Sequence, residues 1–146
     1  MNFDELLAFA GRHPMLSGAL VLLTLALIYT EVARLLRPFK GLRPAELTAL
    51  INREDALVVD LSATADFERG HIAGSRNVVA SAFGPEHKLV AAHKQRPVVL
   101  VDRTGMATGA PATRLKKAGF TQVYVLDGGI AAWQQADLPL VKGRGK

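Results

Sequence analysis

Three aspartates at the ends of short apolar runs are the first candidates for chemistry. They are Asp60, Asp102 and Asp127, which end or follow the runs 56–60, 98–102 and 123–126. Parallel strands place their carboxyl ends at one edge of a sheet, so these carboxylates could hold Mg²⁺ and support phosphoryl transfer, with one aspartate as phospho-acceptor. That chemistry needs a basic partner after the last strand, where this chain has Gly128 and Gly129. The alternative is that the carboxylates bond loop amides and turns.

The stretch 98–120 predicts a strand, a tight loop and a helix. Residues 98–102 read as a buried parallel strand, residues 103–107 as a loop, and the helical pattern runs from about Thr108 to Gly119. In this geometry backbone N–H groups converge at a helix N-terminus and attract an anion or a thiolate. The chain contains no cysteine, which excludes a thiolate nucleophile from this chain. We expect the carboxylate of Asp102 to fill the cradle by accepting N–H groups of residues 104–107.

Two further motifs accompany this stretch. They read GHIAGS at 70–75 and LDGGI at 126–130, the latter followed by Trp133 and by LP at 138–139. With the loop, they make residues 42–141 resemble the rhodanese-like (thiosulfate sulfurtransferase-like) domains. In that family the strand leads into Cys-Arg-x-Gly-x-Arg. Arg103 and Gly105 match this pattern, whereas Asp102 stands at the nucleophilic cysteine and Ala107 at the second arginine.

The resemblance implies the site residues. The equivalents of the active loop are Asp102, Arg103, Thr104, Gly105, Met106 and Ala107, with Asp60 and His71 at the pocket edge. It also implies that His71 holds a loop together and that Arg103 presents a positive charge at the pocket mouth, as the remaining anion contact. Thr108 is expected to cap the following helix. We expect no catalytic residue, no metal and no cofactor in this set.

Apolar runs alternate with helical patterns after residue 43. Helices are expected at 44–52, 64–68, 85–92, from 108 and at 130–135, and strands at 56–60, 77–80, 98–102 and 123–126. This alternation predicts an α/β fold with a central parallel sheet covered on both faces. His87 and His93 would lie on the surface helix 85–92, at a spacing that does not fit a metal pair. The resemblance adds the three-layer rhodanese-like topology.

Residues 15–30 contain no charge and predict a transmembrane helix over 13–36. A secretory signal would have a basic start, but Asp4 and Glu5 are acidic and no Ala-x-Ala site follows. A buried helix of a soluble protein is the other alternative, although apolar side chains occupy every face of this one. Residues 3–10 could lie flat at the interface or form a frayed terminus. The expected organisation is a segment 1–12, the helix 13–36, a basic linker 37–43, the domain 44–141 and a basic tail 142–146.

The charge pattern indicates an orientation. The net charge is +5, and Arg12 alone precedes the helix, whereas four basic residues closely follow it: Arg34, Arg37, Lys40 and Arg43. The positive-inside rule therefore places the N-terminus in the periplasm and the domain in the cytoplasm, at the inner membrane of a bacterium. The basic residues are spread out, without an Arg-rich helix or an aromatic-interleaved stripe, so we expect lipid headgroups and no nucleic acid as partners.

The sequence therefore predicts a membrane-anchored, catalytically inactive rhodanese-like domain that binds a membrane or membrane-associated protein. The alternative is a sulfurtransferase-related or anion-handling enzyme that acts through the 102–107 loop with a partner's thiol. A third hypothesis is structural, with the anchor helix packing against other membrane proteins through its small residues.

Overall fold

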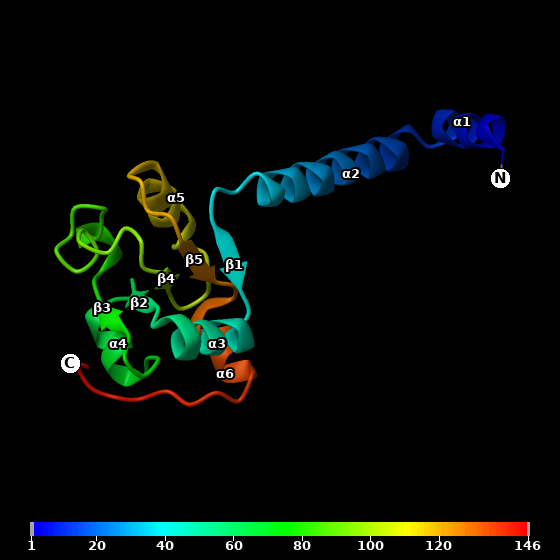
Figure 1. The fold of residues 1–146 in the computed structure, drawn as a ribbon. Helices are drawn as coiled ribbons and strands as arrows, with labels where there is room; N and C mark the ends of the chain where they lie inside the picture. Colours follow the sequence, from blue (N-terminus) through cyan, green and yellow to red (C-terminus); the bar gives the residue numbers. More distant parts are fainter. Residues whose placement is uncertain (1, 146) are drawn as a thin grey trace. The chain divides into compact units, whose positions relative to one another are not determined.

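The computed structural model describes residues 2–145, which divide into two units at residues 37 and 38 (Figure 1). The first unit contains α1 (Phe3–Arg12) and α2 (Pro14–Leu35). The second contains β1 (Lys40–Leu42), α3 (Pro44–Glu54), β2 (Leu57–Asp60), α4 (Thr64–Arg69), β3 (Arg76–Asn77), η1 (Ala80–Ala82), β4 (Val98–Val101), α5 (Gly109–Lys117), β5 (Val123–Leu126) and α6 (Gly129–Gln135).

The five strands form one parallel sheet in the order β1-β5-β4-β2-β3. The central strands β2 and β4 are buried along their whole length, which explains their unbroken apolar sequences. Alternate residues of β4 point to opposite faces: Val98 and Leu100 pack with α5, whereas Val99 and Val101 pack with α3 and α6. The predicted α/β fold with a covered parallel sheet is confirmed.

The linker expected at 37–43 contains a strand. β1 pairs with β5 through Lys40–Tyr124 and Leu42–Leu126, and the Leu42 side chain is buried in the core. Three residues are too short for a periodic pattern to be read, and the basic residues around them suggested a solvated segment. The sheet gains this edge strand through tertiary pairing.

Two other sequence predictions are wrong. Residues 85–92 form no helix but a series of turns, in which His87, Val90 and His93 donate to the carbonyls of Gly84, His87 and Val90. The ring Nδ1 of His87 accepts the Leu89 N–H at 3.2 Å, which takes that amide away from a helical bond. His87 and His93 therefore do not lie on a surface helix.

The strand expected at 77–80 is also wrong in its bounds, because β3 ends at Asn77. The Asn77 side-chain amide donates to the carbonyls of Asp60 and Ser62, at 3.0 and 2.9 Å, and fixes the chain where it leaves the sheet. A 3₁₀ turn, η1, follows after Val78 and Val79.

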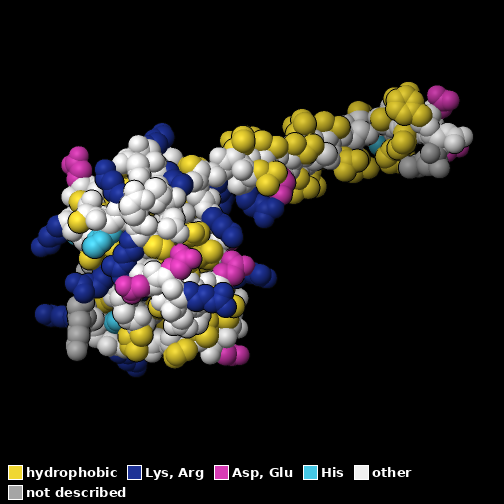
Figure 2. Space-filling model, in the orientation of Figure 1, with side chains coloured by type: hydrophobic (Ala, Val, Ile, Leu, Met, Phe, Trp, Pro, Cys, Tyr) yellow, Lys and Arg dark blue, Asp and Glu magenta, His cyan; other side chains and the backbone are white. Residues whose placement is uncertain are grey.

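The first unit carries nearly all of the exposed large apolar side chains; in the second unit, among the described residues, they are Met106 and Val141 (Figure 2). By length and composition, α2 is the one helix within residues 2–145 that could cross a membrane. Its 22 residues extend about 33 Å, which matches a hydrocarbon core of about 30 Å. Residues 3–10, which the sequence left open between an interfacial helix and a frayed terminus, lie in the helix α1.

The division at residue 38 yields a prediction for a shortened chain. A variant that begins at Pro38 retains β1, so we expect it to fold cooperatively without detergent. A variant that begins at Pro44 lacks β1 and the buried Leu42, and its free energy of unfolding should fall by about 2–5 kcal/mol, the usual cost of truncating one buried leucine. Chemical denaturation followed by circular dichroism measures the difference.

Leu42→Ala in the chain that begins at Pro38 is the matched control, because it removes the buried side chain and keeps the strand. Precipitation of the chain that begins at Pro38, beside a monodisperse full-length chain in detergent, would contradict the division into two units.

Candidate functional site

The carboxylate of Asp102, where β4 ends, accepts two backbone amides of the loop that follows. Its Oδ1 accepts the N–H of Gly105 at 2.5 Å and its Oδ2 accepts the N–H of Ala107 at 2.8 Å. The side chain is buried, with 5% of the residue exposed. This is the arrangement that the sequence predicted, and both oxygens of the carboxylate are engaged by the loop that follows it.

Two glycines allow the 102–107 loop to approach α6. The N–H groups of Ile130 and Ala131 donate to the carbonyls of Asp102 and Arg103, at 2.9 and 3.2 Å. A Cβ at Gly129, whose φ is +62°, would collide with the Asp102 carbonyl oxygen. Gly105, at φ +85°, likewise lies against the backbone of Gly128. Glycine stands after β5 because the backbones of two loops meet there.

Arg103, which was expected to present its charge at the pocket mouth, contacts backbone carbonyls of a neighbouring segment. Its guanidinium Nη2 donates to the carbonyls of Asp66 and of Gly70, the latter at 3.0 Å, and its Nε is buried without a protein partner. The arginine therefore ties the 102–107 loop to the carbonyl end of α4. A carbonyl-binding role leaves no signal in the sequence, because the partners are backbone atoms more than thirty residues away.

Asp60 and His71 also take part in local structure. Oδ1 of Asp60 accepts the Ser62 N–H at 2.9 Å, and the residue is fully buried. Nδ1 of His71 lies 2.8 Å from the Phe67 carbonyl oxygen, and its ring stacks on the Phe67 ring at a centroid distance of 3.7 Å. The backbone of His71 pairs in both directions with Val141. These contacts give His71 a role in holding the segment after α4.

The remaining loop residues divide into buried and exposed ones. Thr108 occupies the N-cap position of α5, but its side chain makes no capping bond; its hydroxyl donates to the Gly105 carbonyl at 3.4 Å. The expected cap is therefore absent at this residue. Thr104, Met106 and Ala107 face solvent, and Met106 is 89% exposed. The outer surface of the loop is thus formed by these three side chains.

The structure does not support the magnesium alternative. Within residues 2–145, no three histidine, cysteine, aspartate or glutamate side chains lie close enough together to hold a metal. Asp102 is engaged by amides, and Asp60 bonds its own turn. The Asp127 carboxylate lies against the β1 backbone, where a Cβ at Gly41 would strike it. Asp60 and Asp102 therefore serve the turn or loop that follows their strands, whereas the Asp127 carboxylate lies against the neighbouring strand β1.

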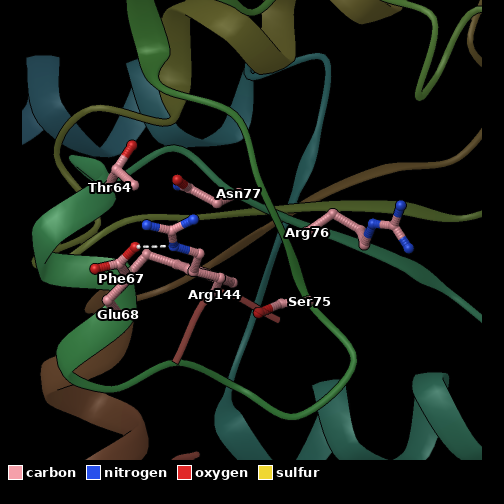
Figure 3. A pocket seen from close by; sticks show the side chains of 7 residues that line it. All are labelled: Thr64, Phe67, Glu68, Ser75, Arg76, Asn77 and Arg144. Atoms are coloured by element: carbon pink, nitrogen blue, oxygen red, sulfur yellow. Dashed lines mark ion pairs between the residues drawn. The ribbon is translucent and has the colours of Figure 1, made fainter. Parts of the chain in front are cut away.

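A hollow of about 440 Å³, which no sequence pattern predicted, lies beside α4. Figure 3 shows its lining side chains: Thr64, Phe67, Glu68, Ser75, Arg76, Asn77 and Arg144. Arg144 comes from the basic tail and pairs with Glu68 at 3.3 Å, while Gly143 donates its N–H to the Glu68 carbonyl. The tail expected at 142–146 thus returns, over its described residues, to the helix whose carbonyls bind Arg103. The charges that line the hollow are mixed, one carboxylate and two arginines, and define no ligand class.

Comparison with known proteins identifies a matching family, relatives in sequence and structures of similar fold. A family model for the rhodanese-like domain matches residues 43–136. The uncharacterized protein YibN of Escherichia coli strain K12 is 45% identical over 142 residues, covering 97% of this chain and 99% of its own length. A thiosulfate sulfurtransferase, GlpE, of Pseudoalteromonas translucida is 31% identical over 98 residues, covering 67% of this chain and 91% of its own. The similarity to GlpE thus covers about two thirds of the chain.

The crystal structure of a rhodanese-related protein from Thermoplasma volcanium superposes with a TM-score of 0.61 at 21% identity, covering 70% of this chain and 98% of that one. A crystal structure from Bacillus halodurans gives a TM-score of 0.62 at 20% identity, over 81% of this chain and 86% of that one. At these identities the superpositions show the fold alone, and they agree with the five-stranded parallel sheet.

The two amide bonds to Asp102 predict the stability of the loop. Asp102→Ala leaves the N–H groups of Gly105 and Ala107 without their acceptor, and we expect the free energy of unfolding to fall by about 1–3 kcal/mol. Asp102→Asn keeps one acceptor oxygen, so its free energy of unfolding should fall by less. Thr104→Ala is the control, because that side chain is exposed on the same loop. Denaturant unfolding of the four proteins measures the effect; equal stability of the Asp102→Ala variant and the original chain would contradict it.

Proposed function

Because the chain belongs to the rhodanese-like domain family, we propose that it is a membrane-anchored member that binds a protein partner and does not transfer sulfur. The observation that carries this proposal is the Asp102 carboxylate, which stands at the family's cysteine position and occupies the amide cradle with its own charge. The domain would keep the shape of a sulfurtransferase site, and the Asp102 carboxylate would take the place of the bound anion.

The chemistry of sulfur transfer explains why Asp102 should be inactive. A thiolate attacks the outer sulfur of a donor such as thiosulfate, the sulfur–sulfur bond breaks, sulfite leaves, and the sulfur stays as a persulfide. The amide cradle lowers the thiol pKa in such sites and holds the anionic intermediate. A carboxylate forms no persulfide. Here the amides of Gly105 and Ala107 already bind the Asp102 carboxylate.

The membrane part of the proposal rests on α2 and on the charges around it. Its length and composition fit a span, and basic residues are more numerous after it than before it. We therefore place the domain on the cytoplasmic side of the inner membrane and residues before the helix in the periplasm. The match with YibN covers 97% of this chain and therefore includes α2.

The outer surface of the 102–107 loop is the proposed contact for the partner. Met106 is 89% exposed and projects from a loop that is anchored at Asp102, Arg103 and Gly105. A rigid loop that displays an apolar side chain loses little conformational entropy when it binds, which favours a protein contact. Most other exposed apolar side chains belong to the helices of the first unit.

An activity assay tests whether the site is inactive. We expect the original chain to form no thiocyanate from thiosulfate and cyanide. The Asp102→Cys variant should gain the mass of one sulfur atom when treated with thiosulfate, because the cradle amides can then serve a thiolate. Asp102→Ser, which offers no thiolate, is the matched control. Thiocyanate formation by the original chain would overturn the proposal and favour the enzymatic alternative.

Crosslinking tests the binding role and the orientation together, since a single introduced cysteine is unique in this chain. Met106→Cys places a thiol on the 102–107 loop, and Gln95→Cys places one on an exposed residue before β4, at the opposite end of that strand. In spheroplasts, a membrane-permeant maleimide that carries a photoactivated benzophenone should give, on illumination, a discrete crosslinked adduct from position 106 and none from position 95. An impermeant reagent should reach neither thiol.

Equal adducts from both positions would show that the loop is not the contact. Labelling of either thiol by the impermeant reagent would place the domain outside the cytoplasm and contradict the orientation.

A further inference from the structure

The first unit contains more helix than a bilayer requires. α1 has 10 residues and α2 has 22, and His13 alone separates them, so the two helices with that residue would extend about 50 Å at 1.5 Å per residue. The hydrocarbon core is about 30 Å thick, and α2 already matches it. Because α1 does not fit into the same span, it must continue in another direction or in water.

The chain has a built-in break between the two helices. Pro14 has no N–H to donate, so the helical hydrogen-bond ladder is interrupted directly after His13, whose backbone is not helical at φ −131° and ψ 66°. The His13 N–H closes α1 on the Phe9 carbonyl at 3.1 Å, and the Ser17 hydroxyl reaches back across the break to the Ala10 carbonyl at 3.5 Å. α1 is thus a helix of its own, and it is drawn separately from α2 in Figure 1.

An apolar groove of about 510 Å³ lies between α1 and α2. Leu6, Leu7, Phe9 and Ala10 line it from α1, and Leu16 and Leu20 are among its lining residues from α2. No charged residue lines this groove. The charges of α1, which are Asp4, Glu5 and Arg12, lie outside the lining, so α1 has one apolar and one polar side.

The position of the groove distinguishes an α1 that lies in the headgroup region from an α1 that extends into water. A helix that leaves a span and lies in the headgroup region must turn its apolar side toward the acyl chains, which is also the side that faces the spanning helix. The groove shows this arrangement, because apolar side chains of α1 and α2 face the same space. In water, the same side chains would expose a continuous apolar surface next to the span.

We propose that α1 lies in the plane of the membrane interface, at the end of the span where α2 begins, and that lipid acyl chains fill the groove between the two helices. The inference rests on the proposed membrane anchor. It assigns residues 3–12 to the lipid surface, with Glu5 and Arg12 toward the headgroups and water.

Spin labels on single cysteines test this inference, since the full-length chain contains no other cysteine. Ala10→Cys and Ala8→Cys form a matched pair, because both replace an alanine of α1, but only Ala10 lines the groove. In vesicles of phosphatidylethanolamine and phosphatidylglycerol, the label at position 10 should collide several-fold more with oxygen, relative to a water-soluble nickel chelate, than the label at position 8. A third label at Leu25→Cys, in the middle of α2, reports on the anchor.

Each outcome has a defined meaning. Nickel access at both positions 8 and 10, with an oxygen-accessible label at position 25, would leave the anchor intact and overturn the interfacial helix. Oxygen access without nickel access at both positions would place α1 inside the hydrocarbon and also overturn it. Low access to both reagents at position 10 would mean that protein, such as a second copy, covers the groove. Nickel access at position 25 would overturn the anchor itself.

Discussion

The bond between the Asp102 carboxylate and the amides of its own loop is the interaction on which the site depends. A buried carboxylate is costly unless hydrogen-bond donors surround it, and Gly105 and Ala107 supply two of them. The loop can offer these donors only because its carbonyls are bonded elsewhere, by the first amides of α6. The carboxylate thus accepts N–H groups of the loop, while α6 donates to carbonyls of the same loop. Together these bonds fix the conformation of its backbone.

Arg103 extends this arrangement to the segment after α4. By donating to the carbonyls of Asp66 and Gly70, it fixes the end of α4 relative to β4, and His71, stacked on Phe67, stabilises the same segment. The Val141 backbone then pairs with His71 and brings the end of the chain to this side of the domain. A residue that resembles part of an anion site thus joins two elements through one of its guanidinium nitrogens. The fold of the family is retained, and Asp102 and Arg103 bond backbone groups within it.

The sequence predicted the elements that depend on local patterns. The apolar strands β2, β4 and β5, the loop after β4 and the cradle at Asp102 all follow from runs of side chains or from a short motif. The errors concern positions that tertiary contacts decide. β1 exists because β5 offers it a free edge, and residues 85–92 are turns because His87 and the buried Val90 fix them individually. The role of Arg103 was missed for a related reason, since its partners are backbone carbonyls that carry no residue identity.

A site whose anion is covalently part of the chain cannot be regulated by binding or losing that anion. In a sulfurtransferase the cradle alternates between a thiolate and a persulfide, so the loop must accommodate two anions that differ by one sulfur atom. Here the same side chain always occupies the cradle, and the loop needs only one conformation. That constraint favours a rigid display surface over a catalytic one, and the side chains available for display are Thr104, Met106 and Ala107. Specificity for a partner would then reside in these outward-facing residues, and the buried residues beneath them would determine how precisely they are presented.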